Sequence, residues 1–375
     1  MASVLQHVSQ PLPVVHALAP APMVPVLVAP SLAPTATGAV VPAVFVFGDS
    51  TADVGTNNYL PESRAKAYML YNGIDYHGSA PTGRFSNGYN TADYIVKSMG
   101  YPESPPAFLH ILYQHRKYLR SVQNFRGVNF ASGGAGLLDD TGKNLYVQQF
   151  ATVHSNLSEA LGGSPENIIG KSFFLISVGS NDIFEYFADL NTNQTLQVFI
   201  ATLMDNYRTH LKSLLDLGAK KIGIISVPAI GCCPYQRTFN ESGGCMEALN
   251  EHAQVFYEEL RVLMENLTTQ HPAMFYSLGN AYNMTTTLLH FADHDPQSPE
   301  LKVIAEACCG NGTMNAEYPC RPNSKLCRDR QIYFFWDQYH PTQTASRILA
   351  SILYDITSKD YVVPMNFRQL ADLSL

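Results

Sequence analysis

One serine, one histidine and one aspartate in this chain stand in an order and a setting that suit acyl-transfer chemistry. Ser50 comes just after the apolar run 44–47, whereas Asp337 and His340 lie three residues apart near the other end of the chain. A serine hydroxyl becomes a good nucleophile when an imidazole takes its proton and a carboxylate holds that imidazole in the right tautomer. The combination predicts a serine hydrolase with Ser50 as nucleophile, His340 as base and Asp337 as the group that orients it.

Each of these motifs is ambiguous in isolation. Gly48-Asp49-Ser50 is typical of a helix N-cap, and Gly179-Ser180-Asn181-Asp182 is typical of an Asx turn at a helix start. The Gly-x-Ser-x-Gly elbow of the common α/β-hydrolases is absent from the sequence. The Asn181 amide can, however, donate a hydrogen bond to an oxyanion, and the glycine-rich stretch 129–136 offers backbone N–H groups. The distant Asp-x-x-His pair makes a catalytic role the favoured interpretation of Ser50 and Asn181.

The residue after His340 is a proline, which predicts how the base is held. Proline is favoured at the first position of a helix, so we expect a helix over 341–356 with His340 at or near its N-cap. Asp337 lies one loop turn earlier and can reach the same imidazole ring.

Five short apolar runs predict the strands that position these groups. They alternate with amphipathic helical patterns over 196–217 and 245–267, which indicates a parallel sheet covered by helices on both faces. Ligands in such sheets bind beyond the carboxyl ends of the strands, where Ser50 and Asn181 are expected. The predicted strands are 43–47, 127–131, 172–178, 221–227 and 273–278.

Composition and charge narrow the class of protein. The 375 residues are 46% hydrophobic and 15% charged with a net charge of −7, so neither nucleic acid nor an anionic membrane surface is an expected partner. Seven cysteines lie in the second half and none has CxxC spacing, which favours disulfides in an oxidising compartment over a zinc site. Cys233, next to Cys232, is our candidate for the unpaired thiol. Six Asn-x-Ser/Thr sequons agree with secretion; they begin at positions 156, 193, 240, 266, 283 and 311.

The first forty residues resemble the apolar core of a signal peptide, but they lack basic residues and contain many prolines. We expect residues 1–41 to be an atypical leader outside the fold, because these prolines also argue against a membrane-spanning helix. The remainder is expected to form one hydrolase domain over 42–360 with a C-terminal tail over 361–375.

The motifs together resemble the plant GDSL esterase/lipase family of the SGNH hydrolase superfamily, in the family's order from about residue 43 to 356. The matching stretches are FGDS at 47–50, PTGRFSNG at 81–88, GVNFASGGAG at 127–136, VGSND at 178–182 and FWDQYHPT at 335–342. One departure is Thr51, where the family motif has leucine; we expect it to tune activity and not to abolish it.

The resemblance implies a three-layer α/β/α, flavodoxin-like fold with a central parallel five-stranded sheet. It implies an esterase or lipase that needs no metal or organic cofactor and acts on a small-molecule or polymer ester. From the cysteines and the sequons we expect the protein to be secreted to the cell exterior or cell wall. It places the oxyanion hole at Ser50, Gly136 and Asn181, with Gly133 and Gly134 as alternatives to Gly136. It also implies a disulfide between Cys232 and Cys245 and pairing of Cys308 and Cys309 with Cys320 and Cys327. An acyltransferase with the same residues and, less favoured, a catalytically silent binding protein are the alternatives.

Overall fold

The computed structural model describes residues 38–120, 124–138, 141, 147–161, 164–189, 192–294 and 300–375. Most of the predicted leader, residues 1–37, lies outside the described residues. Residues 38–41 belong to the compact unit that runs to Leu375, because Val41 is buried and its carbonyl accepts the Tyr101 hydroxyl at 2.6 Å. This compact unit therefore begins before the boundary that we predicted at residue 42.

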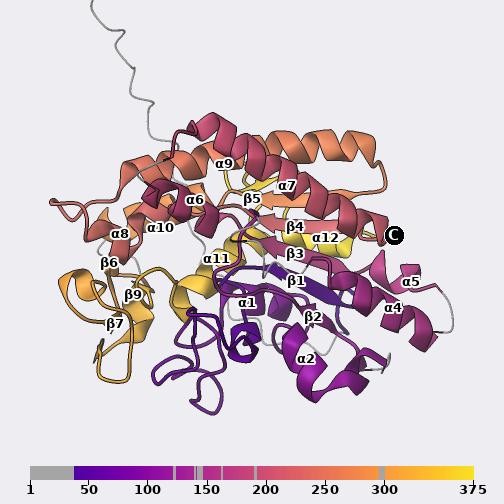
Figure 1. The fold of residues 1–375 in the computed structure, drawn as a ribbon, viewed down its shortest axis with the longest axis horizontal. Coiled ribbons are helices and arrows are strands. Elements are labelled where there is room, and N and C mark those ends of the chain that lie inside the picture. The colour runs from indigo at the N-terminus through magenta and orange to yellow at the C-terminus, as the bar shows by residue number, and fades with distance from the viewer. Residues whose placement is uncertain are drawn as a thin grey trace, which may run out of the picture. The chain divides into compact units, whose positions relative to one another are not determined.

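The centre of the domain is a sheet in which all five predicted strands are present and parallel (Figure 1). The order β2-β1-β3-β4-β5 is that of flavodoxin-like sheets, in which the strand order reverses next to β1. These strands are β1 Val44–Gly48, β2 Gly127–Asn129, β3 Phe173–Ser177, β4 Lys221–Ile225 and β5 Phe275–Gly279.

The sheet has a sixth strand that the sequence analysis missed. Strand β10, Val362–Val363, pairs antiparallel with β5, and helix α12, Phe367–Asp372, follows it. Phe367 is fully buried with its ring 5.6 Å from that of Phe173. The predicted C-terminal tail over 361–375 is therefore wrong, because this segment completes the sheet and the core beneath it.

Helices cover both faces of the sheet. Alternate residues of β1 point to opposite faces: Phe45 and Phe47 pack with α2, α4, α7 and α9, whereas Val44 and Val46 pack with α1, α11 and α12. Helices α7 and α9 lie side by side over the first face (Figure 1). The helices are α1 Thr91–Ser98, α2 Phe108–Gln114, α4 Phe150–Leu161, α5 Glu166–Ile169, α6 Ser180–Ala188, α7 Leu196–Asp216, α8 Pro234–Arg237, α9 Glu247–Gln270, α10 Ala281–His294 and α11 Gln343–Asp355. In the described part of the chain, no helix combines the length and the apolar character needed to cross a bilayer.

Three disulfides join loops outside the main sheet. Cys232 pairs with Cys245, Cys308 with Cys327 and Cys309 with Cys320, and Cys233 is a free, buried thiol, so these predictions are confirmed. Two small sheets lie in this region: β6 Val303–Ala307 pairs with β9 Tyr333–Phe335, and β7 Cys309–Gly310 pairs with β8 Lys325–Leu326.

Candidate active site

Ser50 lies in a tight turn at the carboxyl end of β1. A Cβ atom on Gly48 would lie 2.3 Å from the Ser177 carbonyl oxygen, so only glycine fits this approach of β1 to β3. The buried Asp49 carboxylate then accepts the N–H of Thr51 at 2.9 Å and its hydroxyl at 2.7 Å, which closes the turn around Ser50. Ser50 consequently lies beyond the carboxyl ends of the parallel strands, next to the position where the strand order reverses.

His340 meets Ser50 across 290 positions of sequence. Its Nε2 atom lies 2.7 Å from Ser50 Oγ, and its Nδ1 atom lies 2.8 Å and 3.0 Å from the two carboxylate oxygens of Asp337. Asp337 Oδ1 also accepts the backbone N–H groups of Tyr339 and His340, at 3.0 Å and 2.9 Å. The structure thus connects Ser50, His340 and Asp337 through one unbroken series of hydrogen-bond contacts.

The surroundings of this pair change the basicity of both groups. Burial alone lowers the pKa of His340, but the neighbouring Asp337 carboxylate outweighs it, so the pKa of the imidazole lies above its ordinary value. Burial raises the pKa of Asp337, but the positive charge on His340 and the hydrogen bonds from the turn bring it below its ordinary value. Asp337 therefore stays ionised while His340 is set to accept a proton.

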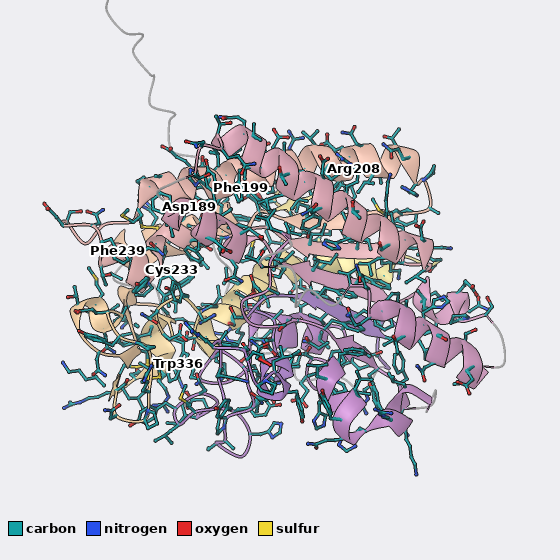
Figure 2. The ribbon with its side chains drawn as sticks, in the orientation of Figure 1. Asp189, Phe199, Arg208, Cys233, Phe239 and Trp336 are labelled. Carbon is teal, nitrogen blue, oxygen red and sulfur yellow. A yellow bond between two sulfur atoms is a disulfide. The ribbon has the colours of Figure 1, made fainter. Side chains whose placement is uncertain are left out.

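The loop that carries Asp337 and His340 is fixed by its own buried anchor. Trp336, labelled in Figure 2, is fully buried. Its indole N–H donates to the Asn72 side chain at 2.9 Å, and its backbone N–H donates to the His340 carbonyl at 2.7 Å. Trp336 packs against Cys308 and Cys309, so the two disulfides of this region stabilise the segment that carries the candidate base.

The helix that follows the base begins later than predicted. Helix α11 starts at Gln343, and Thr342 is its N-cap because the threonine hydroxyl accepts the Ala345 N–H at 3.2 Å. Pro341 instead bridges back to Phe335 of β9. His340 consequently sits in a loop folded onto β9, near the N-cap as predicted but two residues before it, and the helix begins at Gln343 and not at residue 341.

Gly136, the glycine that we predicted for the oxyanion hole, has a different task. Its N–H donates to the Thr141 carbonyl at 3.0 Å, and a Cβ atom there would lie 2.5 Å from the Asp182 carboxylate. Tight packing around buried Asp182 explains this glycine, so the structure argues against Gly136 as an oxyanion donor. Asp182 also accepts the N–H groups of Leu137 and Leu138 and thereby holds the loop.

Gly134 is the better candidate in the same loop. It is exposed, it has the positive φ of 85° that favours glycine, and its N–H has no partner within the described residues, whereas Gly133 and Ala135 donate to Asp53 and Ser132. The loop reaches the Ser50 turn through the Ser132 N–H, which donates to the Gly48 carbonyl at 3.0 Å.

Asn181, in the first turn of α6, lies against this loop. One N–H of its amide donates to the Ala135 carbonyl at 2.8 Å. Among the residues that the structure describes, neither its second amide N–H nor the Ser50 backbone N–H has a protein partner. Ser50, Gly134 and Asn181 therefore each have one N–H group without a partner among the described residues, and each residue follows the carboxyl end of a parallel strand.

Phe85 is a site residue to which sequence reasoning gave no role. Its ring centroid lies 4.9 Å from that of His340, and a Cβ atom on Gly133 would come within 2.7 Å of it. Phe85 belongs to the stretch 81–88 that carries part of the family resemblance, which was the available signal. It fills the space between the candidate base and the glycine loop.

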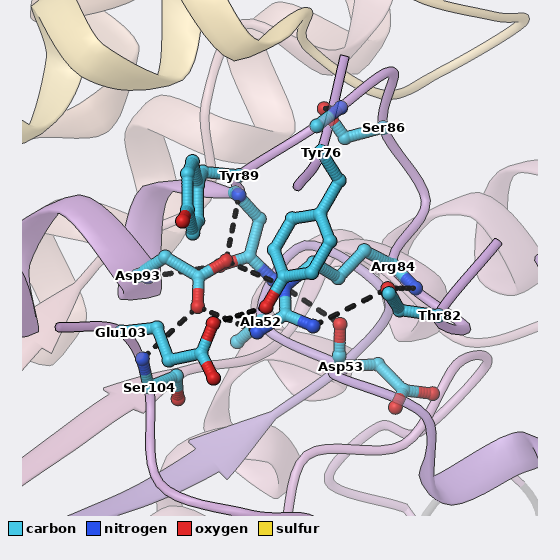
Figure 3. Close-up of polar contacts among 12 residues, drawn as sticks. Ala52, Asp53, Tyr76, Thr82, Arg84, Ser86, Tyr89, Asp93, Glu103 and Ser104 are labelled. Atoms are coloured by element: carbon cyan, nitrogen blue, oxygen red, sulfur yellow. Dashed lines mark hydrogen bonds and ion pairs between the residues drawn. The ribbon is translucent and has the colours of Figure 1, made fainter. Parts of the chain in front are cut away.

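Next to Phe85, a buried ion pair fixes the backbone (Figure 3). Arg84 Nε and Nη2 lie 2.7 Å and 2.8 Å from the two carboxylate oxygens of Asp93 in α1, and both side chains are buried. The Tyr76 ring covers the guanidinium at 4.7 Å, and Asp93 further accepts the N–H groups of Asn90 and Ser104. Such a bidentate, fully packed pair sets the position of the Phe85 segment relative to α1.

We expect Arg84→Met to destabilise the domain by about 3–5 kcal/mol, because it leaves the Asp93 carboxylate buried without its cation. Arg261→Met is the matched control: Arg261 pairs with Glu258 and Glu265 at an exposed position, where the loss is expected to stay below about 1 kcal/mol. The free energy of unfolding in urea measures both. Equally small losses in the two variants would contradict the anchoring role of Arg84.

Comparison with known proteins agrees with this geometry. Residues 44–353 match the GDSL-like Lipase/Acylhydrolase family. The chain is 34% identical to GDSL esterase/lipase At5g55050 of Arabidopsis thaliana over 89% of this chain and 92% of that protein. It is also 34% identical to GDSL esterase/lipase At4g16230 of the same plant, over 90% and 93% of the two chains. The family match covers every element that carries the candidate site, and the chain therefore belongs to the GDSL-like lipase/acylhydrolase family of ester hydrolases.

Proposed function

We propose that this chain hydrolyses carboxylic esters, such as lipid, cutin-like or acetyl esters, through a covalent acyl-enzyme on Ser50. The observation that supports the proposal most is the contact series from Ser50 Oγ to His340 Nε2 at 2.7 Å and from His340 Nδ1 to Asp337 at 2.8 Å. A nucleophile, a base and an orienting carboxylate within hydrogen-bond reach are the requirements for acyl transfer.

Acylation follows from these contacts. Ser50 Oγ attacks the ester carbonyl carbon while His340 Nε2 takes the hydroxyl proton, which gives a tetrahedral oxyanion and an imidazolium beside Asp337. The bond between the carbonyl carbon and the alcohol oxygen then breaks, and His340 returns the proton to the departing alcohol. The acyl group is left as an ester of Ser50.

Deacylation repeats the cycle with water. His340 removes a proton from a water molecule, whose oxygen attacks the acyl carbon of the Ser50 ester. Collapse of this second oxyanion breaks the bond to Ser50 Oγ, which regains its proton from His340, and the carboxylic acid leaves. The low pKa of Asp337 keeps it negatively charged through both imidazolium stages.

We assign the oxyanion hole to the backbone N–H groups of Ser50 and Gly134 and to the Asn181 amide. We expect Asn181→Ala to lower kcat by about 10²- to 10³-fold with little change in KM, because the donor acts chiefly in the transition state. The matched control is Asn206→Ala: the Asn206 amide donates to the Leu137 carbonyl of the same loop at 2.9 Å, and its loss is expected to cost less than about tenfold. Equal losses in both variants would mean that Asn181 only holds the loop.

Turnover of p-nitrophenyl butyrate, followed with and without an alcohol such as 1-butanol, tests the proposed reaction. Hydrolysis predicts butyric acid as the main product in both mixtures. A predominant butyl ester would reassign the same acyl-enzyme to acyl transfer, and folded protein without any turnover would indicate a binding protein.

We further propose that the protein is secreted to the cell exterior or cell wall. Its three disulfides and its plant relatives are compatible with the secretory route. Expression of the full chain in plant cells, with recovery from the medium and a mass decrease after N-glycan removal, is the expected result. Retention of unglycosylated protein inside the cell would contradict it.

A further inference from the structure

A largely apolar cavity of about 90 Å³ lies on the α11 side of the sheet. Strands β3 and β4 form one wall, and α1, α10, α11 and the loop after β9 form the others. None of the three candidate oxyanion donors lines it, and the proposed reaction assigns it no role.

Part of the cavity lining comes from chain neighbours of the candidate catalytic residues. Thr51 follows Ser50 directly, and Tyr339 and Pro341 flank His340; all three line the cavity and are partly exposed. The Thr51 hydroxyl is satisfied by Asp49 at 2.7 Å and lies 3.2 Å from Ser177 Oγ, so it adds no unpaired polar group to this part of the lining.

Much of the remaining lining consists of buried apolar side chains. Leu175, Met284 and Leu353 are each at most 1% exposed. The free thiol of Cys233 lies in the wall, and burial raises its pKa to about 12, so it stays neutral and behaves as a small apolar group. The lining therefore favours a flexible hydrocarbon over a charged or sugar-like group.

We propose that this cavity binds the aliphatic acyl chain of the substrate, so that the enzyme prefers esters of medium-chain acids to acetate esters. The inference rests on the proposed acyl-enzyme chemistry. The acyl group stays attached to Ser50 between the two half-reactions, whereas the alcohol must leave to solvent. A cavity lined by the chain neighbours of Ser50 and His340 and by buried apolar side chains suits the part of the substrate that stays.

A series of p-nitrophenyl esters tests this preference. Each buried methylene is expected to raise kcat/KM by about fourfold until the cavity is filled, so that butyrate and octanoate esters exceed the acetate ester. Met284→Trp, which puts a larger side chain into the lining of the cavity, is expected to lower kcat/KM for the octanoate ester by more than about tenfold and for the acetate ester by less than about twofold. Met284→Ala is expected to move the optimum to longer chains.

Met99→Ala is the control, because Met99 is a fully buried methionine of the same core cluster that does not line the cavity. It is expected to lower stability without changing the chain-length profile. Equal effects of Met284→Trp on acetate and octanoate esters would overturn the inference. So would a profile that shifts with the alcohol chain of alkyl acetates, which would assign the cavity to the alcohol.

Calorimetric titration with octanoate separates failure of this inference from failure of the proposed reaction, since binding needs no turnover. The wild-type protein is expected to bind octanoate at least about tenfold more tightly than Met284→Trp. The same result in a protein that hydrolyses no ester would overturn the reaction and support the cavity. Absence of binding in an active esterase would overturn the cavity assignment alone.

Discussion

Replacing Ser50 with alanine is expected to lower kcat for p-nitrophenyl esters by about 10⁴- to 10⁶-fold. Without the Ser50 hydroxyl no acyl-enzyme forms, and the remaining oxyanion donors can only assist direct attack by water. Initial rates on p-nitrophenyl butyrate measure this loss, with the protein concentration determined by absorbance.

Ser213→Ala is the matched control for this change. The Ser213 hydroxyl donates to the Thr209 carbonyl at 3.0 Å within α7, at an exposed position outside the site, so its removal is expected to leave the rate within about twofold. Thermal unfolding should show that both variants are folded. Activity retained in folded Ser50→Ala protein would mean that another residue is the nucleophile.

The second large effect is expected at Asp337. Asp337→Asn keeps the shape of the side chain but removes the negative charge that faces His340 at 2.8 Å, so the imidazole can adopt the wrong tautomer. We expect kcat to fall by about 10⁴-fold near neutral pH. The control is Asp205→Asn, which breaks only an exposed pair with Arg208 and is expected to change the rate by less than about twofold.

The pH profile of the same variant gives a readout that a loss of folding does not produce. The pKa of His340 is raised in the folded enzyme, so its protonated form persists to higher pH and kcat/KM is lost as the pH falls through that raised pKa. Without the Asp337 charge the imidazolium is less stable, and the acid limb of the profile is expected to move to lower pH. An acid limb that does not move would contradict the electrostatic role of Asp337.

The parts of the fold set by local patterns could be predicted from the sequence. Strands β1, β3 and β4 are largely apolar runs because they are buried on both faces, and this pattern can be recognised in each of them from the sequence alone. Strand β10 has only two residues, and its pairing with β5 depends on how α10 and α11 bring the chain back. Such a strand has too little pattern of its own to be predicted.

Some residues of the candidate site could likewise be predicted from the sequence, and others could not. Ser50, Asp337 and His340 could be named because their residue types and their positions after strands limit the chemistry. The choice between Gly134 and Gly136 could not, because it depends on which N–H is already used, and the Gly136 N–H donates to Thr141 only in this particular loop conformation. The roles of Phe85 and Asp182 likewise depend on packing between segments far apart in sequence.

Thr51 shows how a departure from a family motif can be understood from its contacts. The family's leucine cannot hydrogen-bond, whereas Thr51 bonds the Asp49 carboxylate beneath the Ser50 turn and lies beside Ser177. The threonine therefore adds a hydrogen bond that stabilises the turn, while its side chain still lines the apolar cavity. We still expect the substitution to tune activity without abolishing it.

Labelling with a fluorophosphonate, followed by peptide mass spectrometry, tests most directly whether the N-terminal hydroxyl and the C-terminal imidazole act together. We predict one adduct per molecule on the peptide that contains Ser50, absent from Ser50→Ala and slowed by at least about 10³-fold in His340→Ala. A folded wild-type protein that takes up no label, or takes it up on a different residue, would contradict the account.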